Sequence, residues 1–377
     1  MNNFFRTLLI LAFFSGVFFA CSTDDDLKPT EVELETKIGQ MLMIGFRGME
    51  IGPDDQITKD LIDGRVGGVV LFDLDVALDF APRNVESPAQ VLSLNEQLDF
   101  YASLSGDIPL LISVDQEGGR VARLKPDYGF PETVSAEYLG TINNDDTTAY
   151  YSSIIANTLA DHGFNVNLAP VVDVNINPES PAIGAIGRSF SDDPEVVAHH
   201  ASIVVDEHRK RNLITTLKHF PGHGSATGDT HYDVTDVTNT WDESELVPYE
   251  IMIQLGKADM IMTAHIYNAN WDMEYPATMS KNVITGILRN QLGFDGVVIS
   301  DDMNMGAITD EFGLEEAIYR TIDAGVDILI FANNLVYDEL IATKATDIIL
   351  DLIAAGKISE SRIDQSYQRI IELKERL

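Results

Sequence analysis

Ionisable side chains gather in the stretch KHFPGHGSATGDTH, which supplies Lys218, His219, His223, Asp229 and His231. An imidazole exchanges protons near neutral pH, and the Asp229-x-His231 spacing suits a carboxylate that orients such a ring. Three glycines and one proline break any regular helix here. The pattern therefore predicts a shaped loop that carries acid–base chemistry.

Zinc is the alternative chemistry for this stretch, because His219, His223 and His231 together with Asp229 could in principle bind the ion. Glycines flank His223, so His219 and His223 do not form a helical His-x3-His pairing, and the loop has no recognisable metal-ligand spacing. We therefore expect no metal at this site.

The elements that must position these residues are short apolar runs, each followed by polar or ionisable residues. Eight such runs occur: Met41–Phe46, Gly68–Phe72, Leu110–Val114, Asn165–Ala169, Leu213–Leu217, Met260–Ala264, Val297–Ser300 and Ile328–Ala332. Segments with helical periodicity separate most of them, such as Val91–Leu104 and Val283–Leu292.

This alternation, with chemistry at the same end of nearly every run, predicts an α/β fold: a TIM-type (β/α)8 barrel forming a single catalytic domain over residues 32–377. A doubly wound open sheet would usually carry a glycine-rich phosphate turn after its first strand, and the sequence has none. Two more helices are expected at the end of the chain, Asp338–Ala354 with Gly356 at its cap, and one that begins at Ser359. Because few residues follow Phe331, we expect no second catalytic domain there.

The first residues have the composition of a targeting segment. Arg6 precedes an apolar run too short to span a bilayer, so residues 1–20 are predicted to be a signal peptide. Cys21 follows directly and resembles the lipidated cysteine of bacterial lipoproteins, although an ordinary signal peptide with an incidental cysteine is the alternative. Residues 21–31 then form an acidic tether, which resembles a cell-surface export tag or is a plain solvated linker.

The chain is strongly acidic, with a formal net charge of −35 at pH 7. That charge argues against nucleic acid and anionic membrane surfaces as partners. We expect an exported monomer that contacts the outer membrane only through its lipid anchor, on the periplasmic or the cell-surface side.

Four motifs together resemble glycoside hydrolase family 3, most closely its single-domain, NagZ-type β-N-acetylglucosaminidases. They are DQEGGRVARL (Asp115–Leu124), IGRSF (Ile186–Phe190), KHFPGHG followed by GDTH, and GFDGVVISDDMNM (Gly293–Met305), in the expected order over most of residues 36–335. The resemblance implies that Asp301 is the nucleophile of a retaining glycosidase and that His231, oriented by Asp229, is its acid/base. Asp302 is excluded because adjacent strand residues point to opposite sides.

The resemblance also implies a subsite for a terminal N-acetylglucosamine. Its expected ligands are Asp115, Arg123, Arg188, Lys218 and His219, which can hydrogen-bond hydroxyls or the acetamido oxygen.

Other polar residues near these motifs are expected to act on the structure rather than on the sugar. Glu117 and Arg120 are predicted to form a salt bridge or cap beneath the loop, and His223 to shape the loop. Asp173 and His265 also sit at strand ends, without an assigned role.

These residues predict hydrolysis of a terminal β-linked N-acetylglucosamine from glycans or peptidoglycan fragments through a glycosyl-aspartate, without a cofactor. β-Glucosidase or β-xylosidase activity is a first alternative, and transfer of the sugar to phosphate, as by an N-acetylglucosaminide phosphorylase, is a second. A non-catalytic glycan-binding surface lipoprotein is the alternative of another class; it should have lost the nucleophile or the dyad, and both are present.

Overall fold

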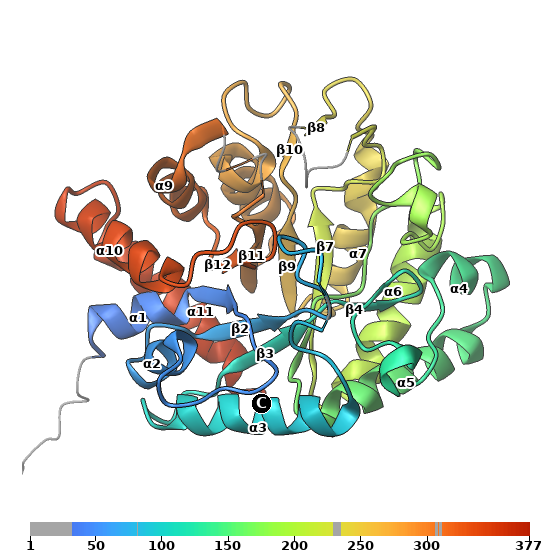
Figure 1. Ribbon diagram of the computed structural model, residues 1–377. Coiled ribbons are helices and arrows are strands. Elements are labelled where there is room, and N and C mark those ends of the chain that lie inside the picture. Colours follow the sequence, from blue (N-terminus) through green and yellow to red (C-terminus); the bar gives the residue numbers. More distant parts are fainter. Residues whose placement is uncertain (1–31, 81, 229–234, 306–307, 309–310) are drawn as a thin grey trace, which may run out of the picture. The chain divides into compact units, whose positions relative to one another are not determined.

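Eight parallel strands close into a barrel at the centre of the structure (Figure 1), in the order β1-β12-β11-β9-β7-β6-β3-β2. The computed structural model describes residues 32–80, 82–228, 235–305, 308 and 311–377. The barrel strands are β1 Leu42–Gly45, β2 Gly68–Leu71, β3 Leu111–Val114, β6 Val166–Asn167, β7 Ile214–Phe220, β9 Met260–Thr263, β11 Val297–Asp302 and β12 Ile328–Phe331. Each lies in or overlaps one of the eight predicted runs, so the predicted TIM-type (β/α)8 barrel is confirmed.

The strands are apolar because the barrel interior and the surrounding helices bury both of their faces. Every residue of β1, β2, β3, β9 and β12 is buried. In β1, Met43 is paired with Gly68 on one side and with Ile330 on the other. Gly45 ends this strand where the backbone of Ala332 comes so close that a Cβ would lie 1.9 Å from its carbonyl oxygen.

Helices surround the barrel on its outside (Figure 1). They are α1 Leu34–Gln40, α2 Gln56–Ile62, α3 Pro88–Ser103, α4 Ala136–Ile142, α5 Asp145–Asp161, α6 Pro194–Arg209, α7 Val247–Gln254, the π-helix η5 Asn282–Gln291, α9 Leu314–Ala324, α10 Ile341–Ala354 and α11 Glu360–Lys374. Short 3₁₀ turns η1 to η4 occupy Pro126–Tyr128, Gly184–Ile186, Glu243–Leu246 and Ala277–Met279. Two small sheets lie outside the barrel, formed by β4 Gln116–Gly118 with β5 Val121–Ala122 and by β8 Thr235–Asp236 with β10 Ile266–Tyr267.

The C-terminal helices largely follow the prediction. Gly356 has a φ of 71°, as expected of a residue just after a helix end, and the Ser359 side chain accepts a hydrogen bond from the Arg362 amide. Helix α10 begins three residues later than predicted, at Ile341. The reason is local, because the Asp338 carboxylate accepts the Leu340 amide in a turn that precedes the helix.

Strand β7 differs from the prediction at its carboxyl end. It was expected to stop at Leu217, with Lys218 and His219 in a loop, but it continues to Phe220. The proline and glycines that break regular structure begin only at Pro221. The two ionisable residues are therefore held by the barrel itself, which fixes them more firmly than a loop would.

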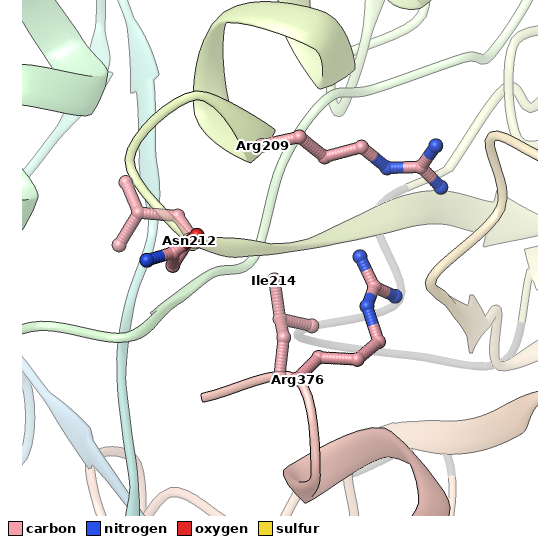
Figure 2. A pocket seen from close by; sticks show the side chains of 5 residues that line it. Arg209, Asn212, Ile214 and Arg376 are labelled. Carbon is pink, nitrogen blue, oxygen red and sulfur yellow. The ribbon is translucent and has the colours of Figure 1, made fainter.

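The opposite end of the barrel carries two fully buried carboxylates, each placed just before a strand. Asp259 precedes β9 and accepts hydrogen bonds from Arg209 (2.6 Å), Arg376 (2.8 Å) and the Thr215 amide and hydroxyl. Figure 2 shows Arg209 and Arg376 extending on either side of the segment that carries Asn212 and Ile214. They line a hollow of about 340 Å³.

Asp327, just before β12, is bound in the same way. It accepts the Val298 amide at 3.0 Å, Arg289 at 2.6 Å and the Ser366 hydroxyl at 2.7 Å, with Arg369 at 3.2 Å. Asp259 and Asp327 join neighbouring strands to the outer helices at the amino ends of the strands. We call this end of the barrel the closed end, and these contacts stabilise it.

The predicted signal peptide, Cys21 and the acidic tether lie outside the described residues. Within the described residues, the model contains no helix with both the length and the apolar character needed to cross a membrane.

Candidate active site

A pocket of about 370 Å³ opens at the carboxyl ends of the barrel strands. Its lining includes Asp301 and all five predicted sugar ligands, namely Asp115, Arg123, Arg188, Lys218 and His219. These residues are far apart in the sequence, and the barrel brings them together. Asp229 and His231, the predicted acid/base dyad, lie outside the described residues.

Lys218 is the most buried of the lysines and arginines that line this pocket. Its side chain is 2% exposed, and its Nζ lies 2.6 Å from Asp115 and 2.8 Å from Glu117. Burial alone would lower the pKa of Lys218, but the two carboxylates raise it above its usual value. Asp115 stays ionised for the reciprocal reason, because Lys218 and Arg123 outweigh its burial and lower its pKa. Asp115 therefore presents a fixed negative charge to the pocket.

Glu117 anchors the second cation of the pocket. Both of its oxygens accept hydrogen bonds from Arg188, at 2.7 and 2.8 Å, in a bidentate pair. Burial of Glu117 is outweighed by Arg188 and Lys218, which hold its pKa well below the usual range. Glu117 thus has the predicted structural role, with Arg188 and Lys218 as its salt-bridge partners instead of Arg120. Arg120 is exposed and has no ion-pair partner among the described residues, so the prediction for Arg120 was wrong.

Asp173 has a clear structural role that the sequence did not reveal. It is fully buried, and one carboxylate oxygen lies 2.7 Å from Nδ1 of His219. The other oxygen accepts the backbone amides of His219 (3.1 Å) and His223 (2.8 Å). His219 therefore donates through Nδ1, and its Nε2 faces Arg188 at 3.3 Å as an acceptor. The only sequence signal for this role was the position of Asp173 soon after a predicted strand.

The glycines of KHFPGHG allow the segment after β7 to pack closely against its neighbours. A Cβ on Gly224 would lie 1.7 Å from the Val174 carbonyl oxygen, and Gly222 has a φ of 115° beside Glu245. The Gly224 amide donates to Glu245 at 2.8 Å. Burial raises the pKa of Glu245 to about 8. His223 is buried here as well, and its pKa is lowered to about 4 by burial and by His219, which fits its predicted role in shaping the loop.

Asp301 and Asp302 end strand β11, where the register with β12 shifts between Ile299 and Asp302. Because of this irregularity, both aspartates line the pocket, and simple alternation along the strand does not separate them. Both carboxylates accept backbone amides, and Oδ1 of Asp301 accepts a hydrogen bond from the Asp302 amide at 2.8 Å. The Asp302 carboxylate accepts the backbone amides of Ala332 (2.9 Å) and Asn304 (3.0 Å), which ties it to the neighbouring strand end.

His265 contacts the backbone at the carboxyl end of β11. Its Nε2 lies 3.1 Å from the Asp302 carbonyl oxygen, and its Nδ1 lies 2.8 Å from the Thr278 hydroxyl. His265 is fully buried. Its position therefore indicates that it holds the backbone at the end of β11, close to Asp301.

The described residues contain no group of three or more histidine, cysteine or acidic side chains arranged to hold a metal ion. Of the four residues considered for zinc, His231 and Asp229 lie outside that part of the chain. His219 already shares its Nδ1 with Asp173.

The geometry defines an enzyme of the (β/α)8 class, with ionised side chains held at the carboxyl ends of its strands. The family model for the glycosyl hydrolase family 3 N-terminal domain matches residues 33–373. The chain belongs to this family, and the expectation of a glycoside hydrolase is confirmed.

Relatives agree with this assignment. The chain is 34% identical over 370 residues to the beta-hexosaminidase A of Pseudoalteromonas piscicida, covering 90% of this chain and 60% of that protein. It is 36% identical over 330 residues to the beta-hexosaminidase of Xylella fastidiosa strain M23, covering 84% of this chain and 92% of the relative.

A solved structure shows the same fold. A family 3 beta-N-acetylglucosaminidase from Paenibacillus superposes with a TM-score of 0.83 at 35% identity, covering 92% of this chain and 62% of its own. This chain thus spans about three fifths of the Pseudoalteromonas and Paenibacillus proteins and nearly all of the Xylella protein.

Proposed function

We propose that the protein is a retaining exo-β-N-acetylglucosaminidase. The observation that carries the proposal is the pocket in which Asp301 and the five predicted sugar ligands meet. The named activities of the Xylella and Paenibacillus relatives support the choice of N-acetylglucosamine over glucose or xylose.

In the proposed reaction, a carboxylate oxygen of Asp301 attacks the anomeric carbon, and the bond from that carbon to the leaving oxygen breaks. His231, protonated and oriented by Asp229, gives its proton to the leaving oxygen. A glycosyl-aspartate results. Neutral His231 then takes a proton from water, whose oxygen attacks the anomeric carbon, and Asp301 is released as a carboxylate.

The other side chains of the pocket bind and orient the sugar. Asp115 accepts hydrogen bonds from the sugar hydroxyls, and the charge of Lys218 keeps the Asp115 carboxylate ionised. Arg123, 3.6 Å from Asp115, and His219 complete the polar wall. Arg188 contributes less directly, because three of its hydrogen bonds go to Glu117 and the Ala182 carbonyl. No cofactor takes part in this scheme.

The test is turnover of p-nitrophenyl β-N-acetylglucosaminide beside the matching β-glucoside, with residues 22–377 as wild type, Asp301→Ala and His231→Ala. The proposal predicts preference for the glucosaminide, loss of turnover in Asp301→Ala and a strong reduction in His231→Ala. Turnover of neither compound by folded wild-type protein would contradict it. A glucoside preference would favour the glucosidase alternative.

We also propose that the chain is exported and anchored through lipidated Cys21 after removal of residues 1–20, with residues 21–31 as a tether. The apolar run before a lone cysteine supports this. Expression with a radiolabelled fatty acid tests the proposal. We expect labelled wild-type protein in the membrane fraction and no label in the Cys21→Ser variant. Wild-type protein without label would overturn the proposal.

A further inference from the structure

An apolar patch lies on the rim of the barrel mouth. It consists of Leu74, Val76, Leu78, Phe80 and Val336, whose exposed fractions are 37, 46, 61, 59 and 61%. Hydrophobic side chains gathered in this way often mark a binding surface. These residues come from the segments that follow β2 and β12, two elements that flank β1 in the barrel. We refer to them as the mouth patch.

The backbone beneath the mouth patch is firmly held. Asp75 and Phe80 are joined by two backbone hydrogen bonds, 2.8 and 3.2 Å, which close a tight turn. The Asp75 carboxylate is almost fully buried and pairs with Arg47 at 2.5 Å and with Arg83 at 3.7 Å. These contacts keep the turn in place while Leu78 and Phe80 remain exposed.

A second set of hydrogen bonds joins this turn to the segment after β12. The Ala77 amide donates to the Asn334 carbonyl at 2.9 Å, and the Val76 amide donates to the Asn334 side chain at 3.0 Å. The two segments therefore form one continuous surface, on which Val336 accompanies the exposed residues of the turn.

The mouth patch continues into the pocket. Leu74 and Val76 line the pocket together with Leu335, the neighbour of Val336. The polar groups of the pocket, such as Asp115 and Lys218, suit the sugar that is cleaved off. The leaving group must extend from that sugar toward the opening, where Leu74, Val76 and Leu335 offer hydrocarbon beside the polar side chains of Asp73, Lys125 and Asn334.

We propose that the mouth patch binds the aglycone of the substrate and selects aglycones that present an apolar surface. This inference rests on the proposed glucosaminidase function and assigns the substrate class that the same site prefers. The aglycone is the expected ligand because the mouth patch begins inside the pocket, at Leu74 and Val76, and continues to the exposed rim. Burying hydrocarbon on Leu78 and Phe80 then contributes binding energy that a small leaving group cannot gain.

The test is a series of methyl, butyl, hexyl and octyl β-N-acetylglucosaminides. Their leaving alcohols differ little in basicity, so differences in kcat/KM report aglycone binding rather than bond reactivity. Wild-type kcat/KM should rise with chain length, by up to about fourfold per methylene, since burial of one contributes about 0.8 kcal/mol. The double variant Leu78→Ser, Phe80→Ser should flatten this rise.

A matched control is Phe100→Ser, Leu104→Ser, which removes two residues of similar exposure, 58 and 55%, at the end of α3. The control should keep the wild-type dependence on chain length. A wild-type kcat/KM that does not change with chain length, or an equal rise in the Leu78, Phe80 variant, would overturn the proposal. Failure to cleave any glucosaminide, including the methyl compound, would instead overturn the proposed function.

Discussion

The two ends of the barrel use buried carboxylates in opposite ways. At the closed end, Asp259 and Asp327 are fully buried, and both oxygens of each are occupied by backbone amides, hydroxyls or arginines. At the mouth, the Asp115 side chain remains 17% exposed, and with Asp301 it lines an open pocket. Carboxylates therefore join strands to helices at the closed end, whereas at the mouth they line the pocket in which the proposed ligand binds.

A buried ion pair does not by itself mark an active site, because both ends of the barrel contain such pairs. What distinguishes the mouth is that carboxylates themselves, Asp115 and Asp301, line its cavity beside cations that a supporting layer such as Glu117 holds in place. Mutations at the two ends should therefore separate activity from stability.

The largest effect is expected at Asp301. Asp301→Ala should lower kcat by about 10⁴-fold or more, because no other group replaces a covalent nucleophile. Thermal unfolding should change little, which steady-state assays and calorimetry on the same preparation would check. An active Asp301→Ala enzyme would contradict the claim that the carboxylates at the mouth serve catalysis.

The counterpart at the closed end is Asp327→Ala. It leaves Arg289, Arg362 and Arg369 without their shared carboxylate, and we expect about 3–5 kcal/mol less stability in urea unfolding. The folded fraction should keep the wild-type kcat. Loss of activity without loss of stability would show that the two ends are not separate in function.

Glu117→Gln tests the supporting layer of the mouth. The neutral amide would leave Arg188 and Lys218 without one of their charges, and kcat/KM should fall by about ten- to a hundredfold. Folding should also lose part of its acid sensitivity, because Glu117 has a lowered pKa and stabilises the fold only while ionised. Unchanged kinetics in this variant would mean that Glu117 is as purely structural as Asp327.

Glu245→Gln should have the smallest effect, seen in the pH dependence of stability. Burial raises the pKa of Glu245 to about 8 in the folded protein, whereas in the unfolded chain the carboxyl ionises near its usual value of 4.5. Folding therefore takes up a proton, and the stability of the wild type should decline between pH 4.5 and 8. Melting temperatures across this range should decline less steeply for the glutamine variant, and parallel curves would contradict the raised pKa.

The sequence predicted the barrel well because short buried strands and amphipathic helices leave strong periodic signals. The apolar runs also placed Asp115, Lys218 and Asp301 at strand ends, and the resemblance to family 3 implied that these residues share a site. The sequence missed the bond between Asp173 and His219, which depends on a contact between the segment after β6 and strand β7. It also missed the irregular register of β11, which brings Asp302 to the pocket beside Asp301.

The most direct test of the account is to identify the residue that carries the sugar. Wild-type protein would be incubated with a 5-fluoro derivative of N-acetylglucosaminyl fluoride, which slows hydrolysis of the intermediate, and then digested for tandem mass spectrometry. The account predicts one glycosyl group on Asp301 and none on Asp302. A label on Asp302, or complete turnover of a natural glucosaminide with no labelled carboxylate, would contradict it.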